Sequence, residues 1–211
     1  MYKNEECVAK YHISDFDLGW LVGFIEGEGC FFIAIREDKR EIKGYNVRPF
    51  FCISLGIKDK NALMNIKEML GKCNIPSSVH ENYMSKDRSC YVNCFLNLGS
   101  NAAFKLRNLL KNCDFKTKKK QDFLLWSEAI DIMRNGEHLT YEGLLKVVDI
   151  KDRMNIRKRK IIRKYTHDFF VSKKDEIMAR FELRNFRNTE GNGSIKGKEV
   201  LIKQGTMHGA E

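Results

Sequence analysis

The feature that most constrains the fold is a stretch near the amino terminus in which glycine recurs every four residues. Gly19, Gly23 and Gly27 fall at positions i, i+4 and i+8, which share one side of an α-helix. Each glycine inside a helix costs roughly 0.8–1 kcal/mol relative to alanine. Three of them in one stripe predict a helix whose backbone is approached closely by another segment.

Both ends of this helix are marked in the sequence. Ser14 and Asp17 have the spacing of a capping box, and Ile13 is placed to pack against Leu18. Gly29 is placed to end the helix. Because the stretch between these signals is apolar nearly all round, we expect the helix to be buried.

The last turn of this helix carries two carboxylates, Glu26 and Glu28. Acidic side chains at a helix carboxyl end oppose the helix dipole, by about 0.3–1 kcal/mol each at exposed sites. A buried, unpaired carboxylate would cost considerably more. A bound divalent cation relieves both penalties, and oxygen ligands suit Mg²⁺. The alternative is an ordinary core helix whose two glutamates emerge into solvent.

Hydrophobic periodicity predicts further elements, in the order helix, hairpin, helix, hairpin, helix, helix, helix. The predicted strands cover residues 30–36, 45–55, about 74–83 and 90–98. The predicted later helices cover residues 58–70 and about 101–112, 118–134 and 141–164. Pro49 indicates an edge strand or a bulge, Gly71 a helix end, and Ser100 and Thr140 helix N-caps. The two hairpins imply an antiparallel sheet in an α/β (α+β) domain.

Charge and cysteine content limit the class of partner. The 211 residues include 38 Lys+Arg and 28 Asp+Glu, a net charge of +10. This surplus indicates a polyanion, most commonly nucleic acid, although it can also serve solubility alone. No apolar run approaches membrane-spanning length, so no membrane partner is expected. Seven cysteines without a metal-binding pattern favour a reducing compartment, with Cys30, Cys52, Cys90 and Cys94 as buried thiols.

Residues 21–29, Leu-Val-Gly-Phe-Ile-Glu-Gly-Glu-Gly, resemble the motif of the LAGLIDADG homing endonucleases, and Cys-Phe-Phe-Ile at 30–33 continues as the strand that this family shows. Residues 115–121 resemble the Lys-rich start of a late helix in single-motif members. Residues 136–144 resemble a segment often found in such intron-encoded proteins. The resemblance reaches about residue 155 and implies an αββαββα core with a saddle-shaped antiparallel sheet, followed by extra C-terminal helices.

The resemblance implies an intron-encoded, site-specific double-strand DNA endonuclease. Since motif helices of two halves pack together in this family, one motif per chain implies a homodimer, with the glycine stripe in the contact. The implied ligands of Mg²⁺ are the Glu28 carboxylate and the Gly27 carbonyl, for phosphodiester hydrolysis. Lys118 matches a basic residue near the scissile phosphate; its alternative is a solvated lysine. Glu26 is expected to be structural.

A glutamine found near the water network in some members aligns with Leu55. Either the alignment is shifted here or another residue serves in its place, with Lys58 and Lys60 as the candidates. DNA recognition is expected from side chains near the two hairpins and the late helices, because a two-stranded ribbon fits the major groove. For each of them, phosphate contact or plain exposure is the alternative to base reading. The expected DNA-contacting residues are Arg36, Lys39, Arg40, Lys43, Arg48, Lys58, Lys60, His80, Tyr83, Lys86, Arg88, Lys116, Lys119, Lys120, Arg157 and Arg159.

The predicted organisation is an N-terminal arm (1–13), the endonuclease domain (14–150), a basic helical extension that follows DNA phosphates (151–183) and a flexible tail (184–211). Two other functions stay open on this scaffold: an RNA maturase, with intron RNA as partner, and a non-cleaving DNA-binding protein. The acidic motif end favours cleavage, because binding alone needs no carboxylate facing a phosphate. The expected location is intracellular, in an organelle or a prokaryotic cytoplasm.

Overall fold

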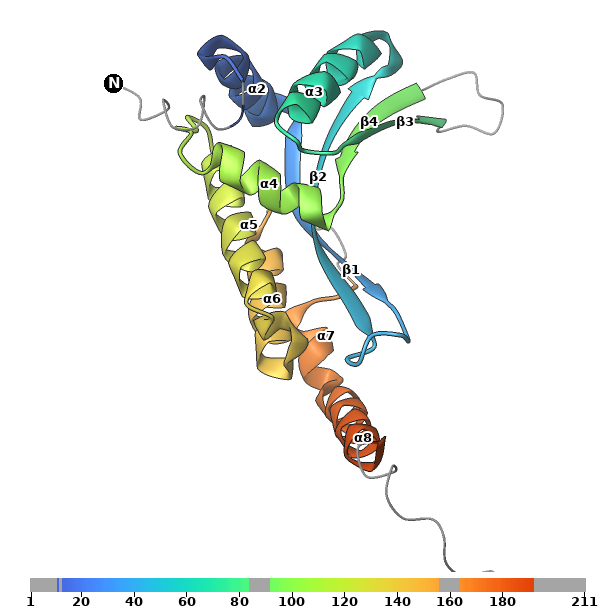
Figure 1. Cartoon of the computed structure of the whole chain (residues 1–211). Coiled ribbons are helices and arrows are strands. Elements are labelled where there is room, and N and C mark those ends of the chain that lie inside the picture. Colours follow the sequence, from blue (N-terminus) through green and yellow to red (C-terminus); the bar gives the residue numbers. More distant parts are fainter. Residues whose placement is uncertain (1–10, 12, 84–91, 156–163, 192–211) are drawn as a thin grey trace, which may run out of the picture.

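The computed structural model describes residue 11 and residues 13–83, 92–155 and 164–191. Within these ranges, four strands form one antiparallel sheet, and helices pack on one of its faces (Figure 1). The elements are α2 (Asp15–Glu28), β1 (Gly29–Glu37), β2 (Tyr45–Gly56), η1 (Ile57–Asp59), α3 (Lys60–Lys72), β3 (Ser78–Tyr83), β4 (Val92–Leu98), α4 (Ser100–Leu110), α5 (Lys119–Arg134), η2 (Glu137–Leu139), α6 (Tyr141–Arg153), α7 (His167–Ser172) and α8 (Lys174–Gly191). No helix within the described ranges combines the length and apolarity of a membrane span.

The strand order in the sheet is β1-β2-β4-β3. β1 pairs with β2 along its whole length, whereas β4 pairs with β2 only over residues 51–56. Pro49 lies opposite Ile33, in the part of β2 that has no β4 neighbour. The predicted edge position of Pro49 is therefore confirmed locally, because no ladder runs on that side of β2 for proline to interrupt.

Alternation along the strands separates a core face from an open face. Phe31, Phe51, Ile53 and Leu96 point toward the helices and are at most 1% exposed. Trp126 of α5 lies against Phe31, with ring centroids 4.9 Å apart. The residues between them in sequence face the opposite side, which we call the open face. The packed core thus holds the sheet in place, and the positions of the side chains on the open face follow from it.

Two of the three predicted N-caps are confirmed. The Ser14 Oγ accepts a hydrogen bond from the Asp17 amide at 3.0 Å, and Thr140 caps α6 in the same way, also at 3.0 Å. The prediction for Ser100 is wrong, because Ser100 is already the first residue of α4 and Gly99 occupies the cap position without a side-chain bond. The strand before α4 ends so late that only Gly99 separates the two elements.

Two predicted helix ends are also wrong. Helix α3 passes through Gly71 to Lys72, and the chain reverses at Asn74, which has a φ of 56°. Asparagine tolerates this left-handed conformation better than most residues. Helix α6 ends at Arg153 and not at residue 164, and Asn155 again adopts a positive φ, of 52°. Residues 156–163 lie outside the described residues.

The junction between α2 and β1 contains no loop. Gly29 is both the C-cap of α2 and the first residue of β1, so the predicted helix end is confirmed. Its φ of −71° is open to any residue, so no left-handed turn explains the glycine. A Cβ at this position would instead lie 2.7 Å from the Ile25 carbonyl oxygen. Glycine therefore allows the chain to pass straight from helix to strand.

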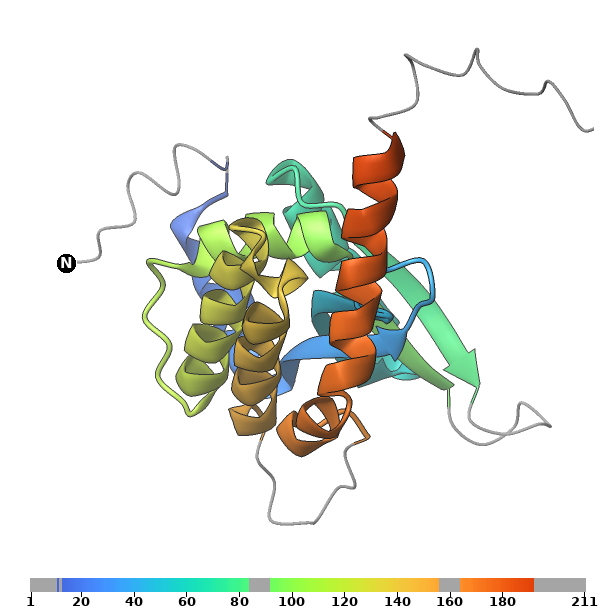
Figure 2. The ribbon, with the colours of Figure 1, turned by 90° about the horizontal axis from the view of Figure 1, so that it is seen from below.

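The C-terminal helices pack against the far end of the first hairpin (Figure 2). Phe170 of α7 is fully buried, and its ring lies 4.9 Å from that of Tyr45, centroid to centroid. Lys164 pairs with Glu37 of β1 at 3.3 Å. The segment predicted as a separate basic extension thus shares a core with the domain before it.

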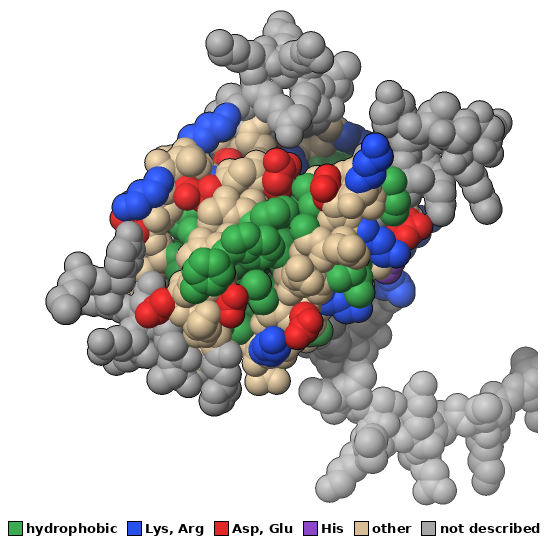
Figure 3. Space-filling view, turned by 90° about the horizontal axis from the view of Figure 1, so that it is seen from above, with side chains coloured by type: hydrophobic (Ala, Val, Ile, Leu, Met, Phe, Trp, Pro, Cys, Tyr) green, Lys and Arg blue, Asp and Glu red, His purple; other side chains and the backbone are tan. Residues whose placement is uncertain are grey.

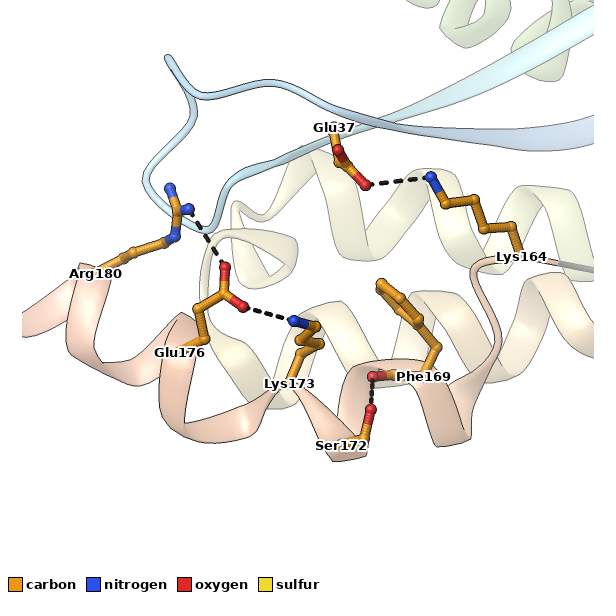
Figure 4. Close-up of polar contacts among 7 residues, drawn as sticks. All are labelled: Glu37, Lys164, Phe169, Ser172, Lys173, Glu176 and Arg180. Atoms are coloured by element: carbon orange, nitrogen blue, oxygen red, sulfur yellow. Dashed lines mark hydrogen bonds and ion pairs between the residues drawn. The ribbon is translucent and has the colours of Figure 1, made fainter.

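Ion pairs at the start of α8 hold the Arg180 side chain, which lies against the turn of this hairpin (Figure 4). Glu176 accepts from Lys173 at 2.9 Å and from Arg180 at 3.4 Å. The Arg180 guanidinium lies over Gly44 in the hairpin turn, where an added Cβ would be 3.2 Å from its Cζ. Because α8 continues to Gly191, the tail predicted from residue 184 begins inside a helix; residues 192–211 lie outside the described residues.

Candidate functional site

Helix α2 has one side built into the molecule and one side uncovered (Figure 3). The built-in side carries three apolar residues that are at most 1% exposed: Leu18, Leu21 and Ile25. On the other side, Gly19, Gly23 and Gly27 are exposed, and nothing lies within 4 Å of a Cβ added at any of them. The expected burial of the whole helix is therefore wrong for this side. No segment in the described part of the chain makes the close approach predicted by the stripe.

Aromatic side chains border the glycine stripe. Phe16 is 80% exposed and Trp20 is 37% exposed, and Trp20 lies against Phe24 with ring centroids 5.1 Å apart. Figure 3 shows a band of hydrophobic side chains across this face with acidic side chains around it. A contiguous exposed apolar band rimmed by polar residues indicates a contact surface.

Glu26, in the last turn of α2, is tied to the segment before α5. Its Oε1 accepts hydrogen bonds from the backbone amides of Lys116 at 2.7 Å and Thr117 at 2.6 Å. Partial burial raises the pKa of Glu26, but the hydrogen bonds from Thr117 and Lys116 outweigh burial and hold the pKa below its ordinary value of 4.5. These contacts support the structural role expected for Glu26.

Glu28, two residues later, is exposed. Within the described residues no group donates to its carboxylate, and the last turn of α2 contains no basic residue. Nor do the described residues hold any cluster of three or more His, Cys, Asp or Glu that could bind a metal ion. The exposed Glu28 carboxylate thus stands at the end of α2 outside any such cluster of the described residues.

The Lys-rich segment before α5 lies beside this turn. Lys119 donates from Nζ to the carbonyl oxygen of the first β1 residue at 2.5 Å, while Lys116 and Lys120 pair with Asp114. Lys118 is exposed at the N-cap position of α5, and its side chain has no partner among the described residues. Of these four lysines, Lys118 thus has the free ammonium group.

Several predicted DNA-contacting residues are accessible as expected. Arg36 on β1 and Arg48 on β2 are exposed on the open face, and His80 is exposed on β3. Lys39 is exposed in the turn of the first hairpin, and Lys58 is exposed in η1. The open face and its margins therefore present positive charge from the first hairpin and from η1, which follows β2.

Other members of the predicted set are buried or paired. The prediction for Lys43 is wrong, because Lys43 is only 2% exposed and burial lowers the pKa of its ammonium group. Arg40 is exposed but binds both oxygens of Asp38, and its hydrogen bonds lower the pKa of that carboxyl to about 2. Lys60 pairs with Glu81 at 2.6 Å.

Some of the residues predicted to contact DNA lie outside the described part of the chain. Tyr83 belongs to β3, but its side chain is not among those described. Four basic residues lie wholly outside the described residues: Lys86, Arg88, Arg157 and Arg159.

The residue aligned with the family glutamine, Leu55, packs against the core. The neighbouring Ser54 is exposed and lies on the open face, so it is the β2 side chain available near the end of this strand. Sequence reasoning missed Ser54, although the alternation of Ile53, Ser54 and Leu55 carried the signal, because Ile53 and Leu55 share the core face.

Residues 21–130 match the family model described as LAGLIDADG endonuclease. Among curated proteins, "Probable intron-encoded endonuclease 3" of Neurospora crassa is 32% identical over 137 residues, which cover 64% of this chain and 24% of that protein. "Probable intron-encoded endonuclease Cox1-I1b" of Schizosaccharomyces pombe is 28% identical over 132 residues, 62% of this chain and 30% of that protein. The chain thus spans under a third of the length of these curated relatives.

Solved structures match over a longer part of the chain. The archaeal intron-encoded homing endonuclease I-Vdi141I, determined in complex with DNA, is 30% identical with a TM-score of 0.65, covering 78% of this chain and 98% of that chain. The homing endonuclease I-TnaI is 28% identical with a TM-score of 0.61, covering 78% and 99%. The predicted αββαββα order, from α2 to α4, is confirmed. On its motif, its fold and these matches, the chain belongs to the LAGLIDADG endonuclease family.

Proposed function

We propose that this chain is a site-specific double-strand DNA endonuclease, encoded within an intron, that acts as a homodimer. The observation that carries the proposal is the exposed Glu28 at the end of the glycine stripe, since the described residues neither pair with this carboxylate nor cover the stripe. The DNA complex of I-Vdi141I and the intron-encoded relatives support DNA as the substrate. A location in an organelle or a prokaryotic cytoplasm stays a prediction.

A second copy of α2 packed on the stripe would complete the site. Without side chains at Gly19, Gly23 and Gly27, two helix backbones can approach closely, and a two-fold axis would bring both acidic ends together. The same packing would cover the exposed rings of Phe16 and Trp20. The dimer therefore accounts for the apolar band and the incomplete metal site by one arrangement.

The two Glu28 carboxylates, with the Gly27 carbonyls, would hold divalent metal ions. Mg²⁺ fits this donor set because it binds a few protein oxygens and keeps the rest of its shell for water and phosphate oxygens. An ion held there would supply Lewis-acid chemistry for hydrolysis of the phosphodiester bond. The free Lys118 ammonium would stabilise the charge that develops on the phosphate. Glu26 acts as a positioning residue, because it holds the backbone just before Lys118.

The open face of the sheet would lie along the DNA. Its exposed Arg36 and Arg48, with Lys39 and Lys58 at its margins, would meet phosphates and base edges. The net charge of +10 favours this association and makes it sensitive to salt.

The test is cleavage of DNA that joins the two sequences flanking the intron, in Mg²⁺, beside a Glu28→Gln variant. The control is the same DNA still interrupted by the intron. The wild type is expected to cut both strands of the joined DNA at one site. The variant should bind this DNA but cut it on the order of a thousandfold more slowly, the scale expected for one preorganised charged group.

Other outcomes would redirect the assignment. Equal cleavage by both proteins would place the metal ligand at another residue. Binding without cleavage by either protein would favour the second candidate, a maturase or a non-cleaving DNA-binding protein on the same scaffold.

A further inference from the structure

The open face of the sheet is apolar where β1 leaves the last turn of α2. Cys30, Phe32 and Ala34 succeed one another on this face of β1, and Phe50 and Cys52 lie beside them on β2. The register pairs Cys30 with Cys52 and Phe32 with Phe50. All five residues are partly exposed, and the two phenylalanine ring centroids lie 4.9 Å apart. We call these five residues the apolar strip.

The strip is uncharged, and basic residues follow it. The Cys30 thiol and burial raise the pKa of Cys52 far above its ordinary value, so Cys52 stays a neutral thiol. Farther along the same face, Arg48 pairs in register with Ala34, and Arg36 is the next open-face residue of β1. The open face therefore changes from apolar to basic with increasing distance from Glu28.

We propose that the apolar strip reads thymine methyl groups in the major groove of each DNA half-site. The inference rests on the proposed function. Apolar side chains gain nothing from phosphates, so on a DNA-facing surface they are suited to base edges. In the major groove the apolar feature of the bases is the C5-methyl group of thymine, which phenylalanine and alanine contact in known recognition. The flanking Arg36 and Arg48 supply the charge that draws this face onto DNA.

Distance along β1 predicts which thymines are read. Phe32 lies four residues beyond Glu28, roughly 13 Å along a strand that rises about 3.3 Å per residue. Since duplex DNA rises about 3.4 Å per base pair, the strip corresponds to roughly four base pairs from the cleaved bond. The thymines concerned should therefore lie in the inner part of the half-site.

A purely structural role is the competing explanation, because a cross-strand aromatic pair also stabilises a hairpin. Such a role would not depend on a methyl group in the DNA. Deoxyuridine separates the two explanations, since it lacks the methyl group of thymine and keeps its hydrogen-bonding groups.

The experiment replaces each thymine of one half-site singly by deoxyuridine, in the duplex joining the intron-flanking sequences. Affinity of the full chain is measured in EDTA, where no hydrolysis proceeds. We expect a fall of about fourfold for each inner thymine replaced, the scale of one buried methyl group, and no change at outer positions. Phe32→Ala and Phe50→Ala should abolish this difference, and Phe32→Leu should keep it.

Arg48→Ala is the matched control, because it should weaken binding to thymine and deoxyuridine duplexes alike. Equal wild-type affinity for both bases at every position would overturn the inference and leave the nuclease function standing. Phenylalanine variants that fold, by thermal unfolding, and still distinguish the two bases would overturn it as well. Specific binding without cleavage of the unmodified duplex would count against the proposed nuclease alone, whereas no specific binding at all would overturn both.

Discussion

Helix α2 has a side that the chain completes and a side that the chain leaves uncovered. On the completed side Leu21 is fully buried, and Glu26 accepts two backbone amides. On the uncovered side nothing lies within 4 Å of a Cβ added at Gly23, and Glu28 has no partner among the described residues. One helix of 14 residues thus separates the groups that serve the fold from those available to a second molecule.

The largest change in the free energy of unfolding should come from the completed side. Leu21→Ala leaves a cavity in the core, so we expect a loss of about 2–5 kcal/mol. Urea denaturation measures the loss. Met64→Ala on α3, where the side chain is 42% exposed, is the control and should stay within about 0.5 kcal/mol. Similar losses for the two variants would show that the helix is not anchored through Leu21.

A smaller loss should follow from Glu26→Ala. The substitution removes two charge-assisted hydrogen bonds, but the carboxylate is partly solvated, so we expect about 1–2 kcal/mol at pH 7. Urea denaturation again gives the value. A variant as stable as the wild type would mean that water replaces both bonds without cost.

The contribution of Glu26 should also depend on pH. Its folded-state pKa lies below the ordinary 4.5, so the ionised group stabilises the fold above about pH 4.5. This stabilisation is lost as the pH falls through 4.5 toward the folded-state pKa. The difference between wild type and Glu26→Ala should therefore be full at pH 7 and shrink below pH 4.5. A difference that is constant down to pH 3 would contradict the assigned hydrogen bonds.

On the uncovered side, Gly23→Leu should disrupt assembly without destabilising the fold. Leucine favours a helix over glycine, so the dilute monomer should gain up to about 0.8 kcal/mol. The added side chain would keep two α2 helices apart, so sedimentation equilibrium should show a monomer where the wild type is a dimer. Gly23→Ala is the graded control and should weaken the dimer less. Undiminished dimerisation of Gly23→Leu would place the interface elsewhere.

The smallest change in the free energy of unfolding should come from Glu28→Ala. This substitution is a matched partner of Glu26→Ala, because both remove a glutamate side chain from the last turn of α2. We expect a shift within about 0.5 kcal/mol, because Glu28 is exposed and none of the described residues pairs with its carboxylate. The same protein should have lost cleavage. A loss above 1 kcal/mol would show that Glu28 supports the fold, which would contradict the division of α2 into a completed side and an uncovered side.

Elements with a local signal were predictable from the sequence. β1 was predicted to within one residue at each end, and Ser14 and Thr140 cap their helices as their sequence positions indicate. The environment of single side chains was less predictable. Lys43 lies in a polar turn and was expected to be exposed, but it is buried. Burial of the His138 imidazole in η2 lowers its pKa, and the charge of Lys43 lies close enough to lower that pKa further. Glu26 likewise finds its donors 90 and 91 residues away.

The glycine stripe shows another property that a single sequence does not determine. Its spacing predicts that a backbone comes close, and it carries no information on whether that backbone belongs to the same chain or to another copy. The described residues leave the stripe open, which supports the second copy that the family resemblance had already implied.

The direct passage from α2 to β1 at Gly29 fixes the distance between Glu28 and the side chains along β1. No loop separates Glu28 from β1, so the spacing between the proposed cutting group and the proposed base-reading side chains is fixed by covalent geometry. One residue inserted there would move the strand by about 3.3 Å and turn every following side chain to the opposite face. The number of base pairs between the cleaved bond and the recognised bases would then be set by the backbone. It could change only by whole residues inserted or deleted at this junction, and not by small shifts.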